Sequence, residues 1–475
     1  MEPISLNFDI DTIAAVSTPP GRGGVAVIRV SGQEARKIVG SAWKGTDLTE
    51  VKSHTAHLGK YINKKGEMLD EALATVFIAP KSFTGEDVVE INIHGSTWIQ
   101  REILKDLMDR GVRMANPGEF TQRAFLNGKM DLAQAEGVAD LISSSSKAAH
   151  DIAISQTKGT FSKEFNSLRE QLIEFASLLE LELDFSEEDV EFADRSKLYL
   201  LCKEIITKIE KLANSYSRGA ALKNGVPIVI AGVPNAGKSS LLNLLLEDEK
   251  AIVADIPGTT RDIIEDTVEI DDILYRFIDT AGIRETFDVV EGIGVQRALA
   301  ALDKAFIIIW VIDTTQAIEP QLKEINLIKT SHPNKNIIIL LNKSDLSSQL
   351  TNSTSNFPHS PVIPFSTRTS HGLPELLKAL KDITTGNQNF DQDIIITNAR
   401  HYEALTKALD SLKKALKSLS PTNSEQSTDS CFSPLSADFI AQDIREAITH
   451  LSSLTGSITS DTLLHSIFSR FCIGK

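Results

Sequence analysis

The nine residues GVPNAGKSS, at positions 232–240, set the architecture that we expect for the middle of the chain. They follow the apolar run PIVIA and precede LLNLLL, which is the strand–loop–helix context of the phosphate-binding motif G-x-x-x-x-G-K-[ST]. Gly232 and Gly237 let the backbone curl so that its N–H groups face phosphate oxygens. Lys238 can add a positive charge beside the β and γ phosphates, and Ser239 can offer a hydroxyl to Mg²⁺. The stretch therefore predicts a nucleotide-binding α/β domain.

Three further motifs follow in the order that a GTPase requires. IDTAG places Asp279 to hold the Mg²⁺ shell and Gly282 to sense the γ phosphate. LLNKSD supplies Asp345, whose carboxylate can accept two N–H donors that guanine offers together and adenine does not. Because FSTR also resembles the last guanine-contacting loop, we expect GTP as the ligand and its hydrolysis as the reaction. The residues expected to contact GTP are Asn235, Ala236, Gly237, Lys238, Ser239, Ser240, Ala254, Asp255, Ile256, Pro257, Gly258, Thr259, Thr260, Asp279, Thr280, Ala281, Gly282, Asn342, Lys343, Asp345, Ser366, Thr367 and Arg368.

Two departures from the common regulatory GTPase pattern point to a monovalent cation. Ile283 stands where a glutamine usually orients the attacking water, and Pro234 would crowd an incoming arginine finger. Another positive charge is therefore needed to stabilise the transition state, and a bound K⁺ is one way to supply it. The segment ADIPGTTRD offers Thr259 and Thr260 to metal and phosphate, and its backbone carbonyls could surround K⁺. Asn235 adds a side-chain oxygen, although an asparagine also fits an unusual turn dihedral there.

Hydrophobic periodicity divides the chain into four segments. Strand and helix signals alternate over 1–122, apolar residues recur at helical spacing over 123–222, short β runs separated by helices fill 223–385, and helical periodicity returns over 386–475. The simplest architecture is an N-terminal α/β domain and a helical domain that both flanks build around an inserted, doubly wound, mainly parallel G domain. Cys202 lies on an apolar helical stripe, so we expect it to pack.

Local patterns predict individual elements. IAAVS and GVAVIRV indicate strands, and VVEINIH alternates like a half-buried strand. Ser31 and Glu34 form an S-x-x-E capping box for the helix that follows. A second helix is expected from about Thr97 to Gly111. Near the C-terminus, an apolar stripe after TSD predicts a helix that Gly474 terminates.

The composition predicts a cytoplasmic protein without a strong basic surface. Forty-nine basic and 64 acidic residues give a net charge of −15, the opposite sign to that of a stand-alone nucleic-acid binder. The longest wholly apolar run, AFIIIWVI, is far shorter than the ~18 residues of a membrane-spanning helix. Cys202, Cys431 and Cys472 are too widely spaced for a disulfide framework or a zinc site. The acidic N-terminus lacks the pattern of a signal peptide, and no membrane partner is expected.

Long stretches of the chain resemble the tRNA uridine-5-carboxymethylaminomethyl modification GTPases, the MnmE or TrmE family. They are PNAGKSS, PGTTRD, DTAGIRET, FCIGK, PPGRGGVAVIRVSG, SFTGEDVVEINIHG and PGEFTQRAFLNGKMDLAQAEGVADLI. The resemblance implies a homodimer that joins an FAD-containing partner in a heterotetramer and acts on tRNA. The complex would add a (carboxymethyl)aminomethyl group at C5 of a wobble uridine, using a folate-borne one-carbon unit. Pairing of the G domains would depend on K⁺ and would drive hydrolysis.

The resemblance also implies roles for single residues. The contacts to 5-formyl- or 5,10-methylene-tetrahydrofolate fall on Arg29, Glu90, Lys129 and Lys475. The Mg²⁺ ligands fall on Ser239 and Thr260, and the K⁺ ligands on Asn235, Ala254, Ile256 and Thr259. The catalytic set is Glu291, which would orient the attacking water, with Lys238, Thr260 and, at the C-terminus, Cys472.

Two other functions fit parts of the sequence. A GTPase switch in ribosome assembly would share the G domain without modification chemistry, but it predicts an RNA-binding appendage and basic charge. A membrane-tethered scaffold would use Cys472 as the lipid site of a C-a-a-X box, although Gly474 and Lys475 make that box a poor one. Cys472 is otherwise a reactive or a packing thiol, and these two readings stay open.

Overall fold

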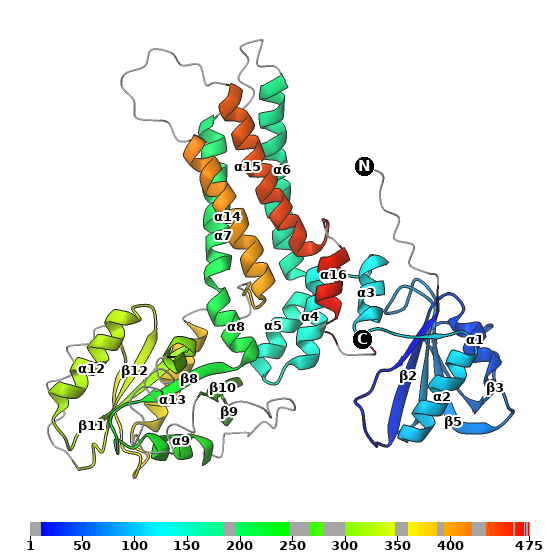
Figure 1. Cartoon of the computed structure of the whole chain (residues 1–475), viewed down its shortest axis with the longest axis horizontal. Coiled ribbons are helices and arrows are strands. Elements are labelled where there is room, and N and C mark those ends of the chain that lie inside the picture. The colour runs from blue at the N-terminus through cyan, green and yellow to red at the C-terminus, as the bar shows by residue number, and fades with distance from the viewer. Residues whose placement is uncertain are drawn as a thin grey trace. The chain divides into compact units, whose positions relative to one another are not determined.

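The computed structural model describes residues 11–184, 195–247, 266–278, 300–346, 360–386, 394–419, 434–458, 461–469, 471 and 474. The chain forms two compact units. The first comprises Met1–Ala139, Gln156–Arg169 and Leu451–Lys475, and the second comprises Asp140–Ser155 and Glu170–His450. In the part of the chain that the structure describes, each unit contains one β-sheet, coloured blue in the first unit and green to yellow in the second (Figure 1).

Among the described residues, a seven-stranded sheet forms the base of the first unit. Its order is β3-β4-β5-β6-β2-β1-β7, and neighbours run antiparallel except β1 and β7. The elements are β1 (Ile13–Val16), β2 (Val25–Ser31), α1 (Ala35–Ser41), β3 (Trp43–Gly45), β4 (Thr55–Ile62), β5 (Met68–Phe77), β6 (Val88–His94), α2 (Thr97–Asp109) and β7 (Arg113–Met114). The two helices pack onto the sheet through Val39, Ile103 and Leu107, which lie in one buried core with apolar residues of β2 and β6. The predicted strands and the second helix are confirmed.

The capping box predicted for α1 is wrong. Ser31 is the last residue of β2, and its buried Oγ donates to Glu86 Oε2 at 2.7 Å. Glu34 is itself the N-cap residue of α1, and its side chain pairs with Lys37 at 2.9 Å. A capping box needs the serine at the N-cap and the glutamate three residues later. A partner distant in the sequence therefore outweighs the local motif here.

In the described part of the second unit, a six-stranded sheet has the order β13-β12-β11-β8-β10-β9. Neighbours are parallel except β9, which is antiparallel to β10. The elements are β8 (Val226–Ala231), α9 (Lys238–Glu247), β9 (Asp266–Ile270), β10 (Ile273–Phe277), β11 (Ile307–Asp313), α12 (Ile318–Ser331), β12 (Asn336–Asn342), β13 (Val362–Pro364) and α13 (Leu373–Thr385). Along β11, Ile309 packs in a core with Leu241 of α9 and Leu376 of α13, whereas Ile308 packs with Ile325 of α12. Helices cover both faces, which confirms the doubly wound fold.

Helices from both flanks of this sheet pack against each other. α7 (Arg195–Asn214) precedes the sheet in sequence and α14 (Ala399–Leu419) follows it, and the two lie side by side (Figure 1). Cys202 on α7 is fully buried, with Sγ 3.7 Å from the Leu412 carbonyl oxygen, and burial raises the pKa of its thiol to about 12. The packing role of Cys202 and the two-flank helical domain are confirmed. Further helices in the described ranges are α5 (Lys147–Thr157), α6 (Thr160–Asp184), α8 (Tyr216–Asn224) and α15 (Pro434–Thr455).

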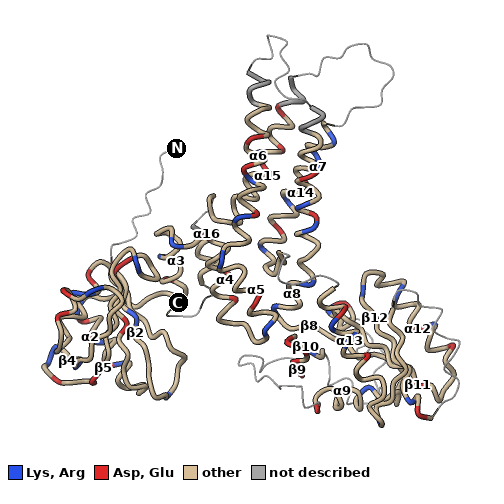
Figure 2. The backbone as a smooth tube through the Cα atoms, turned by 180° about the vertical axis from the view of Figure 1, so that it is seen from behind, with Lys and Arg blue, Asp and Glu red and all other residues tan. Residues whose placement is uncertain are grey.

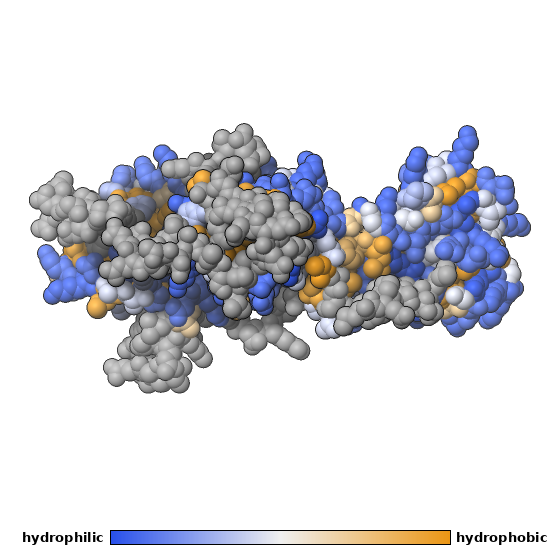
Figure 3. All heavy atoms as spheres, turned by 90° about the horizontal axis from the view of Figure 1, so that it is seen from above, coloured by the Kyte–Doolittle hydropathy of each residue, from blue (hydrophilic) through white to orange (hydrophobic). Residues whose placement is uncertain are grey.

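Charged residues of both signs occur along these helices (Figure 2). Lys413 of α14 pairs with Glu210 of α7 at 2.8 Å, and Lys407 pairs with Glu403 within α14 at 2.7 Å. The face seen in Figure 3 is mainly hydrophilic, with apolar residues in separate groups. No helix in the described ranges is long and apolar enough to cross a membrane.

Within the first unit, the C-terminal residues pack near the N-terminal sheet. The elements here are α3 (Glu119–Leu126), α16 (Asp461–Phe468) and the first part, up to Ala139, of α4 (Leu132–Ser143). The predicted apolar stripe is buried and consists of Leu464, Ile467, Phe468 and Phe471. However, α16 ends at Phe468, so its predicted termination by Gly474 is wrong. Gly474 has φ +92° and instead approaches β1, because a Cβ there would lie 2.3 Å from the Val16 carbonyl oxygen.

Candidate functional site

The loop between β8 and α9 has the shape of a phosphate cradle. Gly232 and Gly237 bound it, with φ values of +139° and +101°. A Cβ on Gly232 would lie 2.2 Å from the Val311 carbonyl oxygen, and a Cβ on Gly237 would lie 2.3 Å from Asn342 Nδ2. Both positions therefore require glycine. The loop leads into the N-terminus of α9, where backbone N–H groups favour anions, and this geometry fits a nucleotide phosphate.

Lys238 lies against the loop that precedes it. Its Nζ donates to the carbonyl oxygens of Gly232 and Val233, both at 2.9 Å. Burial lowers the pKa of Lys238 from its ordinary value. Because those carbonyl oxygens are neutral acceptors, a phosphate would be a stronger partner for the same ammonium group. The lysine is thus placed to neutralise an anion that enters the cradle.

Asn235, Ser239 and Ser240 lie at the exposed rim of the cradle. Asn235 has φ +60°, a conformation that asparagine tolerates better than most residues. This dihedral explains an asparagine at the position, and the residue is exposed. Ala236 lies beneath the rim and is buried, and its carbonyl oxygen takes part in the next contact.

Asn342 joins the phosphate loop to the loop that follows β13. Its Nδ2 donates to the Ala236 carbonyl oxygen at 2.7 Å, and its Oδ1 accepts from the Thr367 backbone N–H at 3.1 Å. The residue is fully buried at the end of β12. Both polar atoms of its side-chain amide therefore hydrogen-bond to the two loops and hold them in position. Asn342 is a support for the nucleotide site rather than a flexible contact.

Ser366 holds Asp345, the carboxylate of the guanine motif. Its Oγ donates to Asp345 Oδ1 at 2.8 Å, and its backbone N–H donates to the His371 carbonyl oxygen at 3.0 Å. Ser366 is buried, whereas Asp345 is exposed. The structure therefore brings Asn342, Asp345, Ser366 and Thr367 together beside the phosphate loop, with Arg368 next to them in an exposed position.

Sequence reasoning missed Asp313. It ends β11 beside Asn342, its register partner on β12, and its Oδ2 pairs with Lys343 Nζ at 2.7 Å. The available signal was an acidic residue that closes the apolar run FIIIWVID. A buried carboxylate at the end of a central parallel strand needs a partner. The strand order, which the motifs do not state, identifies that partner as Lys343.

Several predicted site residues lie outside the described residues, and their roles stay predictions. In the G domain they are Ala254, Asp255, Ile256, Pro257, Gly258, Thr259, Thr260, Asp279, Thr280, Ala281, Gly282 and Glu291. At the C-terminus they are Cys472 and Lys475.

A second polar cluster centres on Arg29 in the N-terminal sheet. Arg29 and Glu90 are register partners on β2 and β6, joined by contacts of 2.9 Å and 2.8 Å to Glu90 Oε1. The Arg29 guanidinium carbon lies 5.3 Å from the ring centre of Phe83, within range of a cation–π contact. Gly474 contributes its carbonyl oxygen, which is 3.5 Å from Arg29 Nη1 and accepts from Ser17 Oγ at 3.0 Å. The C-terminal segment thus reaches this cluster.

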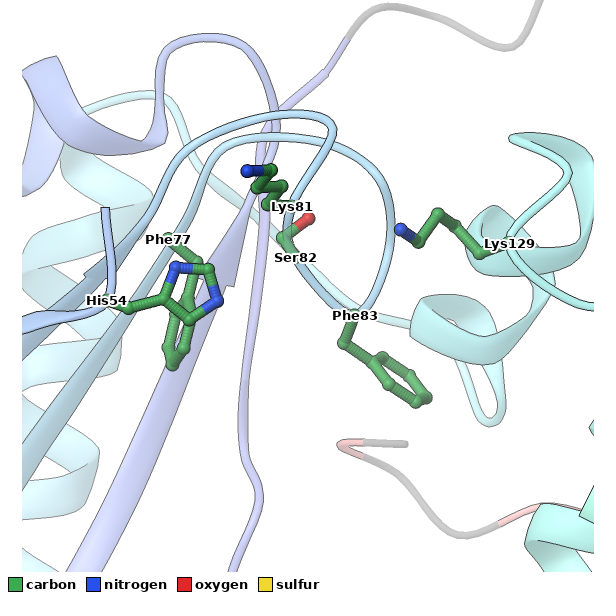
Figure 4. A pocket seen from close by; sticks show the side chains of 6 residues that line it. All are labelled: His54, Phe77, Lys81, Ser82, Phe83 and Lys129. Carbon is green, nitrogen blue, oxygen red and sulfur yellow. The ribbon is translucent and has the colours of Figure 1, made fainter. Parts of the chain in front are cut away.

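A pocket of about 410 Å³ opens beside Phe83. Figure 4 shows Lys129, on a separate segment, reaching toward the loop that carries Lys81 and Phe83, and its Nζ donates to the Pro80 carbonyl oxygen at 2.9 Å. The residues that line the pocket are His54, Phe77, Lys81, Ser82, Phe83 and Lys129. Two lysines beside aromatic rings suit a flat ligand that carries a negative charge. Phe83 lies against Arg29 and also lines the pocket with Lys129, so the Arg29–Glu90 pair and the pocket are neighbours.

Comparisons with known proteins agree over almost the whole chain. A family model described as the GTP-binding protein TrmE N-terminus matches residues 12–129, and one described as the MnmE helical domain matches residues 132–472. A tRNA modification GTPase MnmE from Parabacteroides distasonis is 48% identical over 473 residues, covering 98% of this chain and 100% of that protein. The corresponding proteins of Bacteroides fragilis and Flavobacterium johnsoniae are 48% and 46% identical, each covering 98% of this chain and 99% of the relative. On these matches, the chain belongs to the MnmE family of tRNA modification GTPases.

Proposed function

We propose that this chain binds and hydrolyses GTP in the service of tRNA modification. One observation carries the nucleotide part: Asn342 joins the phosphate cradle to the loop at 366–368, and Ser366 holds Asp345 beside them. These groups lie past the carboxyl ends of β8 and β12, where ligands bind in doubly wound sheets. The relatives, each named a tRNA modification GTPase, support the tRNA part.

In this proposal the cradle and the segments 254–260 and 279–282 hold the phosphates. Lys238 neutralises the β and γ phosphates, and Ser239 and Thr260 hold Mg²⁺, which stabilises charge on the transferred phosphoryl group when bound. Glu291 orients the attacking water, a task that the aliphatic Ile283 cannot perform. The Asn235 side chain and the segment at 254–259 hold K⁺ and favour pairing of two G domains. The K⁺ ligands are then Asn235, Ala254, Ile256 and Thr259.

The N-terminal cluster is the proposed folate site. A carboxylate such as that of Glu90 can accept the N–H donors of a pterin, while Arg29, Lys129 and Lys475 can meet carboxylates of the glutamate tail. The folate, 5-formyl- or 5,10-methylene-tetrahydrofolate, supplies a one-carbon unit when bound. The pocket beside Phe83 supports this assignment, because its two lysines and aromatic rings match the charge and flatness of such a ligand.

The working assembly that we propose is a cytoplasmic homodimer with an FAD-containing partner protein. The complex adds a (carboxymethyl)aminomethyl group at C5 of a wobble uridine in tRNA. The domains in this proposal are the folate-binding domain (1–122), the first helical part (123–222), the G domain (223–385) and the second helical part (386–475).

Exchange of the guanine-reading carboxylate tests the nucleotide site. Guanine offers two N–H donors to Asp345, whereas xanthine has a carbonyl oxygen in place of the amino group. In Asp345→Asn the amide can accept from N1–H and donate to that oxygen, so we expect preference to pass from GDP to xanthosine diphosphate. Competition against a fluorescent nucleotide measures both affinities. An unchanged preference for GDP would remove the guanine site from this loop.

Nucleoside analysis of tRNA tests the wider function. A strain that lacks this chain should lose the C5-modified wobble uridines from total tRNA, and expression of the chain should restore them. Mass spectrometry of digested tRNA measures both. Modified uridines at the parental level in the lacking strain would overturn the tRNA assignment while leaving the GTP site standing.

A further inference from the structure

The end of β11 carries an ion pair whose carboxylate is buried. Asp313 Oδ2 lies 2.7 Å from Lys343 Nζ, and the side chains of Asp313 and Lys343 are 1% and 30% exposed. Lys343 follows Asn342 directly and precedes Asp345 by two positions. The pair therefore attaches the guanine motif to the neighbouring central strand.

Lys343 has a backbone conformation that needs support. Its φ is +63°, in the left-handed region that residues other than glycine, asparagine and aspartate rarely adopt. Such a conformation persists only where surrounding contacts fix it. The ion pair with Asp313 is a contact of this kind, because it ties the side chain of the left-handed residue to a rigid strand end. Loss of the pair would let the motif relax.

Asp313 is itself held in place on both carboxylate oxygens. Its Oδ1 accepts from the Thr315 backbone N–H at 3.0 Å and from Thr315 Oγ1 at 2.6 Å, and its Oδ2 also accepts from Gln316 Nε2 at 3.2 Å. Burial acts to raise the pKa of Asp313, but the hydrogen bonds from Lys343 and Thr315 outweigh it and lower the pKa below the ordinary value. The carboxylate is therefore charged at neutral pH.

The backbone around Asp313 is fixed as well. Gln321 of α12 accepts from the Asp313 backbone N–H at 3.0 Å and donates to its carbonyl oxygen at 3.1 Å. Thr314 donates to the Asn342 carbonyl oxygen from its Oγ1 at 2.7 Å and from its N–H at 3.2 Å. The end of β11 and the guanine motif are thus joined by a network of hydrogen bonds. Asp313 contributes the negative charge that pairs with Lys343.

We propose that Asp313 is a positioning residue for guanine recognition, which fixes Lys343 and so aims the carboxylate of Asp345 at the base. The proposal rests on the nucleotide site proposed above. Asp313 does not touch the nucleotide in this scheme. It acts by keeping the segment 342–345 in the one backbone conformation that presents Asp345 beside Ser366.

The test compares Asp313→Asn and Asp313→Glu in the full-length chain. We expect Asp313→Asn to release fluorescent GDP about tenfold to a hundredfold faster. The amide loses the negative charge and one of the two acceptor oxygens, so it can no longer accept from both Thr315 and Lys343. It should also reduce the preference for GDP over inosine diphosphate, which lacks the amino group that Asp345 reads. Asp313→Glu keeps the charge and should lie between the parent and Asp313→Asn in both measurements.

The matched control is Asp271→Asn in the same domain. Asp271 pairs with Lys381 at 3.2 Å on the surface, and its φ of +49° suits asparagine. We expect parental GDP release and parental base preference in this variant, because an exposed pair contributes little. A change equal to that of Asp313→Asn would show that any lost ion pair has this effect and would overturn the proposal.

The base preference separates positioning from general loosening. Asp313→Asn with parental GDP release, or with GDP and inosine diphosphate weakened by the same factor, overturns the proposal, because a merely structural role affects both nucleotides alike. If Asp313→Asn does not fold, Thr315→Val replaces it in the same two measurements, because this variant removes the hydroxyl that donates to Asp313 at 2.6 Å. A smaller shift in the same direction supports the proposal, and parental values overturn it. If Asp345→Asn does not gain affinity for xanthosine diphosphate, the proposed nucleotide site itself is wrong.

Discussion

In the six-stranded sheet the candidate site residues stand where parallel strands end, whereas in the seven-stranded sheet Arg29 and Glu90 face each other from within antiparallel strands. β8, β11 and β12 are parallel neighbours, so their carboxyl ends share one edge whatever their separation in sequence. Arg29 and Glu90 meet only because β2 and β6 pair in one register. The comparison teaches that motif order can locate the first site, while the second depends on pairing that no motif states.

The C-terminus sharpens the contrast. Gly474 contacts Ser17 and Arg29 from the opposite end of the sequence, and its positive φ permits the close approach to Val16. The nucleotide cradle draws its residues from one continuous α/β segment. The N-terminal cluster is therefore assembled by tertiary contacts, and changes in those contacts should affect it without touching GTP hydrolysis.

Removal of the cradle lysine should have the largest effect, and this effect should be limited to the nucleotide site of the six-stranded sheet. Lys238→Ala takes away the ammonium group that contacts the Gly232 and Val233 carbonyl oxygens. We expect GTP turnover to fall by about 10³-fold, the scale observed when one charge-stabilising donor is lost. Phosphate release under saturating GTP measures the rate. Tetrahydrofolate binding, measured by calorimetry, should remain at the parental value.

Lys381→Ala is the control for this prediction. Lys381 is a half-exposed lysine of the same domain that pairs with Asp271 on the surface. Its removal should leave turnover within about twofold of the parent, as expected for a surface ion pair. Parental turnover in Lys238→Ala would contradict the role of the loop as a phosphate cradle. Loss of folate binding in that variant would show that the two sites are not independent.

Much of the fold follows from local patterns. The alternation in VVEINIH gives β6, and the apolar run before GVPNAGKSS gives β8 and its cradle. These predictions succeed because the periodicity of buried side chains is a local property of each strand. The guanine motif lies beside the cradle because parallel neighbouring strands end at one edge of the sheet. What the sequence indicates well is therefore what one segment can determine alone.

Other features required partners that the sequence does not identify. Ser31 and Glu34 have capping-box spacing, yet Ser31 is drawn to Glu86, which lies on another segment. Asp313 belongs to no local motif, because its role depends on being adjacent to Lys343 across two strands. The helix expected to end at Gly474 ends earlier, since that glycine serves a contact with β1. Tertiary contacts override local signals in each case.

Adding a methyl group at Gly474 tests the tertiary assembly of the N-terminal cluster. In Gly474→Ala the new Cβ would meet the Val16 carbonyl oxygen at 2.3 Å, and φ of +92° disfavours any side chain. We expect the C-terminal segment to move from Arg29 and tetrahydrofolate affinity to fall by about tenfold to a hundredfold, as for a substitution at a strained position. Calorimetric titration measures it. GTP turnover should stay parental.

Gly40→Ala provides the matched comparison. Gly40 lies in α1 of the same unit, and its Cβ would meet only Thr49 Cγ2, at 3.9 Å. Folate affinity should not change in this variant. Equal affinities for the parent and Gly474→Ala would show that the C-terminal segment does not contribute to the cluster, and the contrast between the two sheets would then rest on strand register alone.

Acid should weaken the two units through different carboxylates. Burial acts to raise the pKa of Glu119, but hydrogen bonds from Arg113, the Asn116 N–H and Arg123 outweigh it and lower the pKa below the ordinary 4.5. A carboxylate with a lowered pKa stabilises the folded state fully at pH values above its ordinary pKa. This stabilisation is lost as the pH falls through the lowered pKa of the folded state. Glu119→Gln should cost about 2 kcal/mol at neutral pH and should flatten the acid dependence of the first unit.

Hydrogen-exchange protection of two segments measures this difference. Residues 113–126 should lose protection below pH 4.5 in the parent and much less so in Glu119→Gln. The segment 336–346 should keep its acid dependence in both proteins, because the Asp313 pKa is lowered by Lys343 and Thr315 despite burial. An unchanged acid response of 113–126 in the variant would mean that other carboxylates govern the stability of that region.

The smallest effect should come from neutralising one member of the cross-strand pair. In Glu90→Gln the side chain keeps its shape and one acceptor oxygen for Arg29, but it loses the charge that makes both contacts to Glu90 Oε1 strong. We expect tetrahydrofolate affinity to fall by about tenfold while GTP turnover stays parental. Glu71→Gln, at an exposed position of β5, should change neither quantity. If Glu90→Gln binds folate like the parent, Arg29 and Glu90 are a structural ion pair of the sheet, and the ligand is then held by Lys129 and the C-terminal segment.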